Sequence, residues 1–496
     1  MKRDLLLAID QGTTGTTALV MDLEGRTLAR KNAEFPQHYP QPGWVEHDVS
    51  EIWHSVEASV RGALEAGAID AGRIAAIGIT NQRETTLLWD RASGEQVHRA
   101  IVWQDRRTAD ACATLRAAGH EAEVKRRTGL VLDPYFSGTK LAWLLEHAHG
   151  ARSRAERGEL AFGTIDSYLV HRLSGGARHV TDVSNASRTL LLDLATLAWS
   201  EPMLGLLGVP RSVLPEVVPS AAAIAVTKGL GFLPDGLPIT GIAGDQQAAL
   251  FGQACFGVGD AKCTYGTGAF ALVNVGAEPR ASERGMLSTV AWKVGDEVAY
   301  ALEGSAFIAG AAVQWLRDGL GIIRSAAEIE ELASTVPDAG GLCFVPALTG
   351  LGAPHWDPHA RGLLTGITRG TTKAHIARAV LEGIAFSVGD LLRAMGEDLG
   401  AQPTRLRVDG GAAADDLLMQ MQADFGRLRI ERPAELESTA RGAAMLAGVG
   451  AGLFSSIAEA SRMSPAAKTF EPRMAEQSAR EAWARWGHAV GLATTH

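Results

Sequence analysis

Short apolar runs, each about the length of one strand, alternate with polar turns at the start of the chain. Residues 5–9 and 18–21 flank the turn 10–17, and residues 22–25 form a second turn. Unbroken apolar runs of this length between turn residues are typical of buried strands. The pattern predicts that the chain begins as a meander of antiparallel strands.

Two later segments carry helical periodicity instead. After Asp48, apolar residues recur every four positions at Ile52, Val56, Val60 and Leu64. The same spacing recurs at Ile376, Val380, Ile384, Val388 and Leu392. Both patterns predict an amphipathic helix with one buried face, and Asp48 is expected to cap the first.

The strand, turn, strand plan returns in the second half of the chain. Residues 261–264 lead into Tyr265-Gly266-Thr267-Gly268 and continue through 269–273, and residues 406–409 deliver the glycines at 410 and 411 to a following helix. With 496 residues, of which 46% are hydrophobic, the chain is long enough for two cores. We expect an α/β fold of two similar domains, residues 1–253 and 254–496, with a hinge near 252–259 and a ligand cleft between them.

Charge and cysteine content exclude several classes of function. The formal net charge of −9, with dispersed Lys and Arg, argues against a nucleic-acid partner. The cysteines Cys112, Cys255, Cys263 and Cys343 are far apart and form no CxxC pair, which predicts a reducing, cytoplasmic environment without disulfides or zinc. No apolar stretch is long enough for a membrane span.

The glycine-flanked segment 241–252 contains an acid and two amides, Asp245, Gln246 and Gln247, before the opening turns of a helix. A helix dipole favours an ionised carboxylate at this end. Such a carboxylate after a strand can accept a proton from a substrate hydroxyl, which is the task of a kinase general base. An ordinary N-cap aspartate fits the segment equally well.

The turn at 10–17 has the composition of a phosphate loop. Its two glycines let backbone N–H groups approach an anion and its four threonines supply hydroxyls. It lacks the Gly-Lys-Ser/Thr ending of a Walker loop, so a plain hairpin remains the alternative, but the second Gly/Thr turn at 266–268 strengthens the phosphate interpretation. Asp10 would then hold Mg²⁺, directly or through water. Gly410 and Gly411 suit close approach to a nucleotide or a simple helix entry.

Four further residues suit a small polyhydroxylated substrate. Arg83 and Glu84 follow the apolar run at 74–80, and strand ends of this kind bind ligands in open α/β sheets. Trp103 offers an aromatic wall for a carbon chain, and the Tyr135 hydroxyl offers a hydrogen bond. Taken singly, each has an alternative: a surface ion pair for Arg83 and Glu84, and a core position for Trp103 or Tyr135.

Together these motifs resemble the FGGY carbohydrate kinases nearly from end to end. Residues 135–147 fit one long signature of that family and residues 362–386 resemble the other. Residues 103–107, 244–247 and 350–358 add three shorter matches. The resemblance implies two actin-like (ribonuclease H-like) domains that close over MgATP and substrate.

The resemblance also implies an activity and a set of contacts. The implied reaction is transfer of the γ-phosphoryl group of ATP to glycerol, giving sn-glycerol 3-phosphate, with Asp245 as general base. The polyol positions of the family correspond to Arg83, Glu84, Trp103, Tyr135, Asp245, Gln246 and Phe270. The nucleotide positions correspond to Thr13, Thr14, Gly15, Thr17, Thr267, Gly310, Gln314, Gly411 and Asp415, and Asp10 to the Mg²⁺ position. Relatives further imply a homodimer or homotetramer.

The chain departs from the family pattern in three places. Gly15 and Thr17 stand where the family usually has serine and arginine, so one cationic phosphate contact is missing unless Lys262 or magnesium supplies the charge. Asp415 replaces a common asparagine and loses a donor. The loop 227–235 lacks the features with which some relatives bind fructose 1,6-bisphosphate or receive a phosphoryl group from a carrier protein. The sequence therefore predicts that both regulations are absent.

Three other functions stay open at this stage. The first is a related kinase acting on erythritol or another polyol or ketose. The second is an actin-like ATPase that serves as a scaffold, which would not need Arg83, Glu84, Trp103 and Tyr135 in these places. The third is a catalytically weak member of the family, because Thr17 stands in place of the usual arginine.

Overall fold

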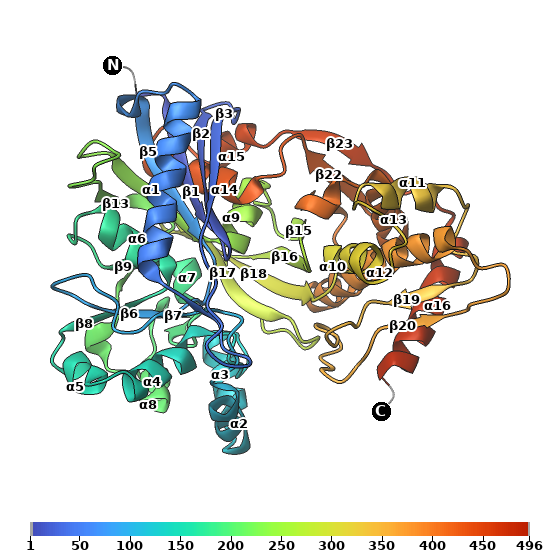
Figure 1. Cartoon of the computed structure of the whole chain (residues 1–496), viewed down its shortest axis with the longest axis horizontal. Coiled ribbons are helices and arrows are strands. Elements are labelled where there is room, and N and C mark those ends of the chain that lie inside the picture. Colours follow the sequence, from blue (N-terminus) through green and yellow to red (C-terminus); the bar gives the residue numbers. More distant parts are fainter. Residues whose placement is uncertain (1–2, 495–496) are drawn as a thin grey trace.

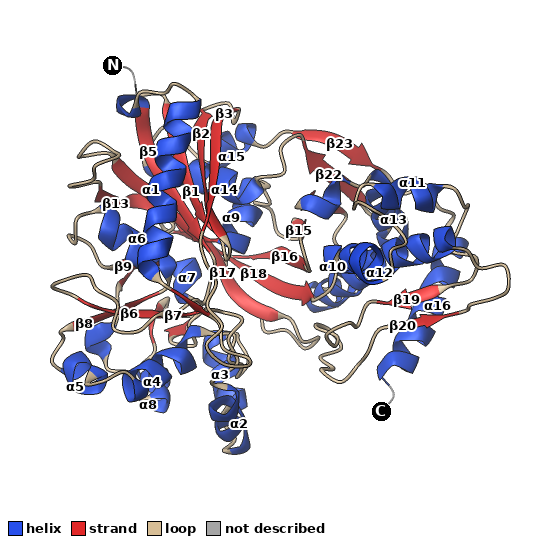
Figure 2. Cartoon of the chain, in the orientation of Figure 1, coloured by secondary structure: helices blue, strands red, loops and turns tan. Residues whose placement is uncertain are grey.

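The computed structural model describes residues 3–494 and is organised around one large mixed sheet with helices on both faces (Figures 1 and 2). The 13 strands lie in the following order from one edge to the other: β23 (Ala466–Phe470), β22 (Arg429–Pro433), β21 (Arg405–Asp409), β15 (Ala261–Tyr265), β16 (Ala269–Gly276), β18 (Glu297–Ala306), β17 (Leu287–Val294), β13 (Ala221–Val226), β14 (Pro238–Gly244), β5 (Ile74–Asn81), β1 (Leu5–Gln11), β2 (Gly15–Asp22) and β3 (Thr27–Glu34). The sheet therefore runs through both halves of the chain.

The remaining elements surround this sheet. The helices are α1 (Val49–Ala66), α2 (Ala109–Ala117), α3 (Glu121–Thr128), α4 (Ser137–His147), α5 (Ala151–Glu156), α6 (Ile165–Leu173), α7 (Val183–Ala186), α8 (Glu201–Leu207), α9 (Asp245–Gly252), α10 (Gly310–Gln314), α11 (Glu328–Ser334), α12 (Lys373–Leu399), α13 (Asp416–Gly426), α14 (Ser438–Gly450), α15 (Ile457–Ala460) and α16 (Glu476–Thr494). Short strands form separate two-stranded pairs: β4 (Glu46–His47) with β7 (Ala100–Ile101), β6 (Leu87–Asp90) with β8 (Leu160–Gly163), β9 (Val180–Asp182) with β12 (Glu216–Val218), β10 (Leu192–Asp193) with β11 (Ala198–Trp199), and β19 (Cys343–Val345) with β20 (Leu363–Thr365).

The two halves share one strand pattern. In the first half, β1, β2 and β3 form an antiparallel meander, and β5 and β14 continue in parallel on the other side of β1. In the second half, β15, β16 and β18 form the equivalent antiparallel set, although β17 comes before β18 in the sequence and lies on its far side in the sheet, and β21 and β22 continue in parallel on the other side of β15. The predicted meander and the predicted repeat are both confirmed. In each half a Gly/Thr turn follows the first strand.

The predicted amphipathic helices are also confirmed. The Asp48 carboxylate accepts a hydrogen bond from the backbone N–H of Ser50 at the start of α1. Ile52, Val56 and Val60 are buried in the core that α1 shares with β1, β2 and β5. Helix α12 buries its equivalent stripe in a separate core of the second half. Helix α1 is held by one apolar face, as the four-residue spacing requires. Helix α12 is buried on more than the predicted face, because residues outside the stripe, such as Leu381 and Phe386, are also buried.

One segment from late in the chain packs against the first half. Helix α14 lies on β5, β14 and α9, and glycines permit the close approach. A Cβ on Gly78 would come within 2.0 Å of the Ala443 carbonyl oxygen, and one on Gly252 within 2.0 Å of the Ser438 carbonyl oxygen. No other residue type fits these positions without a shift of backbone. The domain boundary at residue 253/254 stays a prediction. Helix α14 follows that boundary in the sequence but packs on elements that precede it.

Within residues 3–494, no helix combines the length and the apolar character needed to cross a membrane.

Candidate active site

Asp245 is the first residue of α9 and follows the end of β14 directly. The N-cap of this helix is Gly244, so the alternative of an N-cap aspartate is wrong. The Asp245 carboxylate accepts a hydrogen bond from the backbone N–H of Gln246 at 2.6 Å and its side chain is 33% exposed. The carboxylate is therefore oriented by the helix and open to a substrate.

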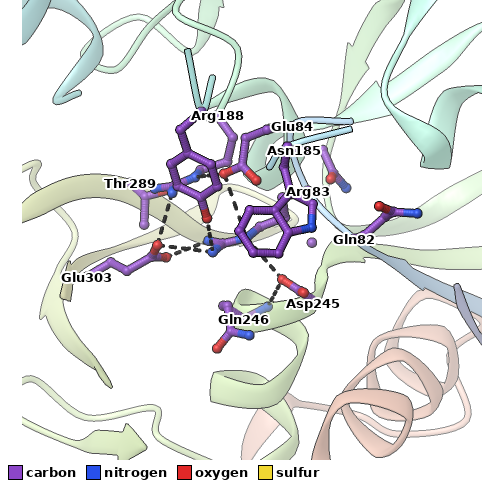
Figure 3. Close-up of polar contacts among 12 residues, drawn as sticks. Gln82, Arg83, Glu84, Asn185, Arg188, Asp245, Gln246, Thr289 and Glu303 are labelled. Atoms are coloured by element: carbon purple, nitrogen blue, oxygen red, sulfur yellow. Dashed lines mark hydrogen bonds and ion pairs between the residues drawn. The ribbon is translucent and has the colours of Figure 1, made fainter. Parts of the chain in front are cut away.

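Arg83 lies beside Asp245 and is buried (Figure 3). Its Nε is 3.0 Å from the Asp245 Oδ1, and its Nη2 donates to the Tyr135 hydroxyl at 3.4 Å. Burial alone would lower the pKa of Arg83, but Glu303, Tyr135 and Glu84 together hold it well above its usual value. The alternative of a surface ion pair is wrong, because Arg83 and Glu84 are both inside the protein.

Glu84 has a backbone φ of 60°, in the left-handed region that non-glycine residues rarely adopt. Its backbone carbonyl accepts a hydrogen bond from the Ser137 hydroxyl at 3.0 Å. Strained backbone of this kind persists where the surrounding structure determines it strongly, and it is concentrated at functional sites.

Trp103 and Tyr135 form one wall beside Arg83. Their rings meet edge to face, with centroids 5.7 Å apart. The Trp103 indole N–H donates to the Thr13 hydroxyl at 3.0 Å, so the wall is joined to the turn after β1. Both side chains are partly exposed, so neither is a fully buried core residue, although Tyr135 does pack against a core cluster of the first half, as its alternative interpretation expected.

Lys262 connects Gln246 with Phe270. From the sequence it was considered only as a positive charge that could contact the phosphates. The buried Lys262 ammonium donates to the Gln246 side-chain oxygen, to the Thr264 hydroxyl at 3.0 Å and to the Phe270 carbonyl at 3.4 Å. Burial lowers the pKa of Lys262. Gln246 lies on α9 and Phe270 on β16, so Lys262 connects the two halves of the sequence at the site.

The nucleotide positions of the second half converge. The backbone N–H of Gly310 donates to the Gly266 carbonyl at 2.9 Å, and that of Ala309 donates to the Thr267 carbonyl at 2.8 Å, which places the start of α10 against the second Gly/Thr turn. Gly410, with a φ of 85°, leaves no room for a Cβ beside the Tyr265 carbonyl. Gln314, Gly411 and Asp415 lie on the elements that these contacts hold together.

Asp415 has one oxygen in use and one free. Its Oδ1 caps α13 by accepting from the Leu418 backbone N–H at 2.8 Å. Its Oδ2 is buried and has no partner among residues 3–494. Burial raises the pKa of Asp415 to about 6. The free atom can meet a donor of a bound ligand, but the aspartate cannot donate in return unless it is protonated.

The first Gly/Thr turn connects β1 to β2, with Thr13 and Thr14 at its tip. Thr17 lies beyond the turn, on β2, and its hydroxyl accepts from the Asn32 side chain on β3 at 2.9 Å. A Cβ on Gly15 would be 3.0 Å from the Ala33 carbonyl oxygen. Gly15 and Thr17, at which the chain departs from the family pattern, are therefore both accommodated by contacts with the adjacent strand β3. A nucleotide contact of Thr17 stays a prediction.

Asp10 is the carboxylate to which the sequence assigns a bound cation. Burial, with the nearby carboxylates of Asp245 and Glu437, raises the pKa of Asp10 to about 8, and the structure gives its carboxylate no hydrogen bond or ion pair within the described residues. No group of three or more metal-ligating side chains exists in the described part of the chain. Mg²⁺ does not require one, since it takes one or two carboxylates together with substrate phosphates and water. The residues present fit a phosphate-bound Mg²⁺.

Two residues that sequence reasoning missed are at the centre of the site. Arg188 is fully buried and donates to Glu84 Oε1 at 2.6 Å, and Glu303 accepts two hydrogen bonds from Arg83. Glu303 is a lone acid within the otherwise apolar interior of β18, which is the signal that could have found it. No local pattern marks Arg188.

A neighbouring histidine predicts a pH dependence of stability. His47 is buried, its Nε2 lies 2.6 Å from the Gln37 side-chain oxygen, and its Nδ1 lies 3.3 Å from the side-chain nitrogen of Gln82, which precedes Arg83. Burial, with a smaller effect of His38, lowers its pKa from 6.5 to about 3. As the pH falls below 6.5 the unfolded chain binds the proton first, so His47 should decrease the free energy of unfolding by about 1.4 kcal/mol per pH unit until about pH 3.

The His47→Gln variant is expected to lose this part of the acid sensitivity, because glutamine does not titrate. Urea unfolding at pH 7, 5.5 and 4.5 measures it as a smaller decline in the variant than in the wild type. Equal declines would show that the native state accommodates a charged His47.

Family models account for most of the chain. Residues 5–252 match the N-terminal domain, and residues 261–451 the C-terminal domain, of the FGGY family of carbohydrate kinases. The chain is 55% identical over 491 residues to a glycerol kinase of Myxococcus xanthus, covering 99% of each protein. It is 56% identical over 485 residues to a glycerol kinase of Alkalilimnicola ehrlichii, covering 98% of this chain and 97% of the relative.

Solved structures agree with this similarity. The crystal structure of Plasmodium falciparum glycerol kinase with ADP superimposes with a TM-score of 0.94 at 34% identity, covering 100% of this chain and 99% of that one. A xylulose kinase of Lactobacillus acidophilus, at 24% identity and a TM-score of 0.86, shares the fold. The two-domain fold expected from the motifs is confirmed. This chain belongs to the FGGY family of carbohydrate kinases.

Proposed function

We propose that this chain phosphorylates glycerol with ATP and releases sn-glycerol 3-phosphate and ADP. The observation that carries the proposal is the contact between Arg83 and Asp245, 3.0 Å apart beside the wall formed by Trp103 and Tyr135. This arrangement offers a carboxylate and a guanidinium next to an apolar face. The curated relatives named above, similar over their whole length, support glycerol as the substrate.

In the proposed reaction, Asp245 accepts the proton of a terminal glycerol hydroxyl as its oxygen attacks the γ-phosphorus. The bond between that phosphorus and the bridging oxygen of ADP breaks. Arg83, Glu84, Tyr135 and Gln246 hydrogen-bond the hydroxyls, while Trp103 and Phe270 cover the carbon chain. Since every hydroxyl then has a partner, the attacking oxygen is held in one orientation.

ATP is proposed to lie between the two Gly/Thr turns. Thr13, Thr14 and Gly15 approach its phosphates from one side and Thr267 from the other, with Gly310, Gln314, Gly411 and Asp415 around the nucleoside. Asp10 would hold Mg²⁺, which neutralises charge on the phosphates. No hydrogen bond joins the two turns within residues 3–494, so the substrates themselves would bridge the halves. Closure of domains 1–253 and 254–496 would exclude water.

The location and assembly of the protein are proposals of the same kind. The four cysteines are free in the structure, which suits the cytoplasm. A homodimer or homotetramer is proposed from the family resemblance.

A panel of polyols and ketoses tests the proposed substrate. With ADP release as the readout, kcat/KM for glycerol is expected to exceed that for erythritol and xylulose by at least about tenfold, because a longer chain leaves a hydroxyl unpaired or meets the aromatic wall. A higher kcat/KM for a four-carbon or five-carbon substrate would show that this substrate, and not glycerol, is the one the protein phosphorylates. ATP turnover that is independent of every polyol would indicate an ATPase instead.

A further inference from the structure

Arg83 is held from two sides by carboxylates (Figure 3). Its Nε faces Asp245, and its two terminal nitrogens donate to Glu303, Nη1 to Oε2 at 2.5 Å and Nη2 to Oε1 at 3.0 Å. This two-point contact fixes the plane of the guanidinium as well as its place, which a single hydrogen bond would not do. Arg83 therefore has a defined orientation before any substrate arrives.

Glu303 is ionised although it is buried. Burial alone would raise its pKa, but the two guanidinium groups of Arg188 and Arg83 lower it to about 2. Its position on β18 also matters, because β18 pairs with β16, where Phe270 lies opposite Ser305 and Leu272 lies opposite Glu303. Strands β16 and β18 therefore carry both Phe270, a wall of the proposed glycerol site, and Glu303, the partner of Arg83.

Arg188 completes a ring of four charges. Its Nε donates to Glu84 Oε1 at 2.6 Å and its Nη2 donates to Glu303 Oε1 at 2.9 Å. The other oxygen of Glu84, Oε2, receives no hydrogen bond within the described residues. Arg188 therefore holds one oxygen of Glu84 and leaves the second available to a ligand.

We propose that Glu303 and Arg188 are positioning residues for glycerol. Glu303 orients the guanidinium of Arg83, whose other N–H groups face Asp245, Gln247 and Tyr135 and would be shared with substrate hydroxyls. Arg188 orients the carboxylate of Glu84 and leaves Oε2 to accept from a substrate hydroxyl. The proposal rests on the proposed function, because Arg83 and Glu84 are taken to bind glycerol. Neither Glu303 nor Arg188 takes part in the proton transfer.

A purely structural role must be separated from positioning, since the loss of one member of a buried ion network destabilises a protein in either case. Glu303→Gln keeps the size and one acceptor but removes the charge. The double variant Arg188→Gln/Glu303→Gln removes one positive and one negative charge and so restores the balance. If the network only stabilised the fold, recovery of stability in the double variant would be accompanied by recovery of glycerol affinity.

Steady-state kinetics and thermal unfolding of the full chain test the proposal. Glu303→Gln is expected to raise the KM for glycerol about tenfold, which corresponds to one charge-assisted hydrogen bond, and to change the KM for ATP less than about twofold. The double variant is expected to regain part of the lost Tm while its KM for glycerol stays raised.

Glu431→Gln is the matched control. Glu431 also lies on a strand of the sheet between two arginines, 3.1 Å from Arg407 and 3.7 Å from Arg405, but outside the site. It is expected to lower Tm and leave the KM for glycerol unchanged.

A wild-type KM for glycerol in Glu303→Gln, or in the double variant once Tm recovers, would overturn the positioning role. The wild type separates the two hypotheses. If it phosphorylates glycerol normally while Glu303→Gln does so with the same KM, only the positioning role fails. If the wild type prefers another polyol, the same comparison is made with that polyol. A wild type that phosphorylates none of them would overturn both.

Discussion

Replacing Asp245 with asparagine is expected to lower kcat for glycerol phosphorylation by about 10²–10⁴-fold, because the amide cannot accept the proton of the attacking hydroxyl. Asparagine keeps the size of the side chain and one oxygen, so the contact with Arg83 and the start of α9 should persist. The change is therefore expected in kcat and not in the KM for ATP. Coupled ADP-release kinetics measure both quantities.

Isothermal titration of glycerol into Asp245→Asn provides the binding control, and affinity within about threefold of the wild type is expected, since one uncharged hydrogen bond contributes about 1 kcal/mol or less. A matched substitution is Glu201→Gln, which removes an exposed acid from the first residue of α8, outside the site. It should leave kcat unchanged. Near-wild-type turnover in Asp245→Asn would assign the proton transfer to another group.

Arg83→Ala is expected to raise the KM for glycerol about 10²-fold, with a much smaller effect on the KM for ATP. The substitution removes a charged donor from the proposed glycerol hydroxyls, and hydrogen bonds to charged groups contribute about 1.5–3 kcal/mol each. It also leaves Glu303 with Arg188 as its remaining guanidinium partner among residues 3–494, so the free energy of unfolding should decrease.

Arg83→Lys distinguishes charge from geometry, because lysine retains the positive charge but lacks the planar fork that meets Glu303 at two points. An intermediate KM for glycerol is expected. A KM for glycerol that stays at the wild-type value in Arg83→Ala, measured at a temperature where the variant is folded, would contradict the proposed contact.

Much of the site could be predicted because its residues occur at places that local patterns mark. Asp245 follows an apolar strand and begins a helix, and Arg83 and Glu84 follow another strand. Ends of parallel strands meet at one edge of a sheet, so residues far apart in the chain are brought together there. The same reasoning correctly placed the two Gly/Thr turns after β1 and β15.

The alternatives that failed did so because they were judged from one segment at a time. Arg83 and Glu84 resemble a surface pair only until Glu303, 220 residues from Arg83, is placed beside them. Trp103 resembles a core residue until its indole N–H is seen to reach Thr13. In both cases the decisive contact is made by a residue from a distant element.

The amino-acid sequence by itself indicated several strands and helices and the repeated strand, turn, strand plan, since periodicity and turn chemistry act over a few residues and are readable along the chain. The family was indicated separately, by the resemblance of its motifs to those of the FGGY carbohydrate kinases. Only the tertiary structure decided which charges meet. The ring of Arg83, Glu84, Arg188 and Glu303 depends on the register between β16 and β18 and on the packing of distant elements. Such pairing leaves no periodic pattern in the sequence, because the partner of a buried charge is determined by its position in space and not by its separation along the chain.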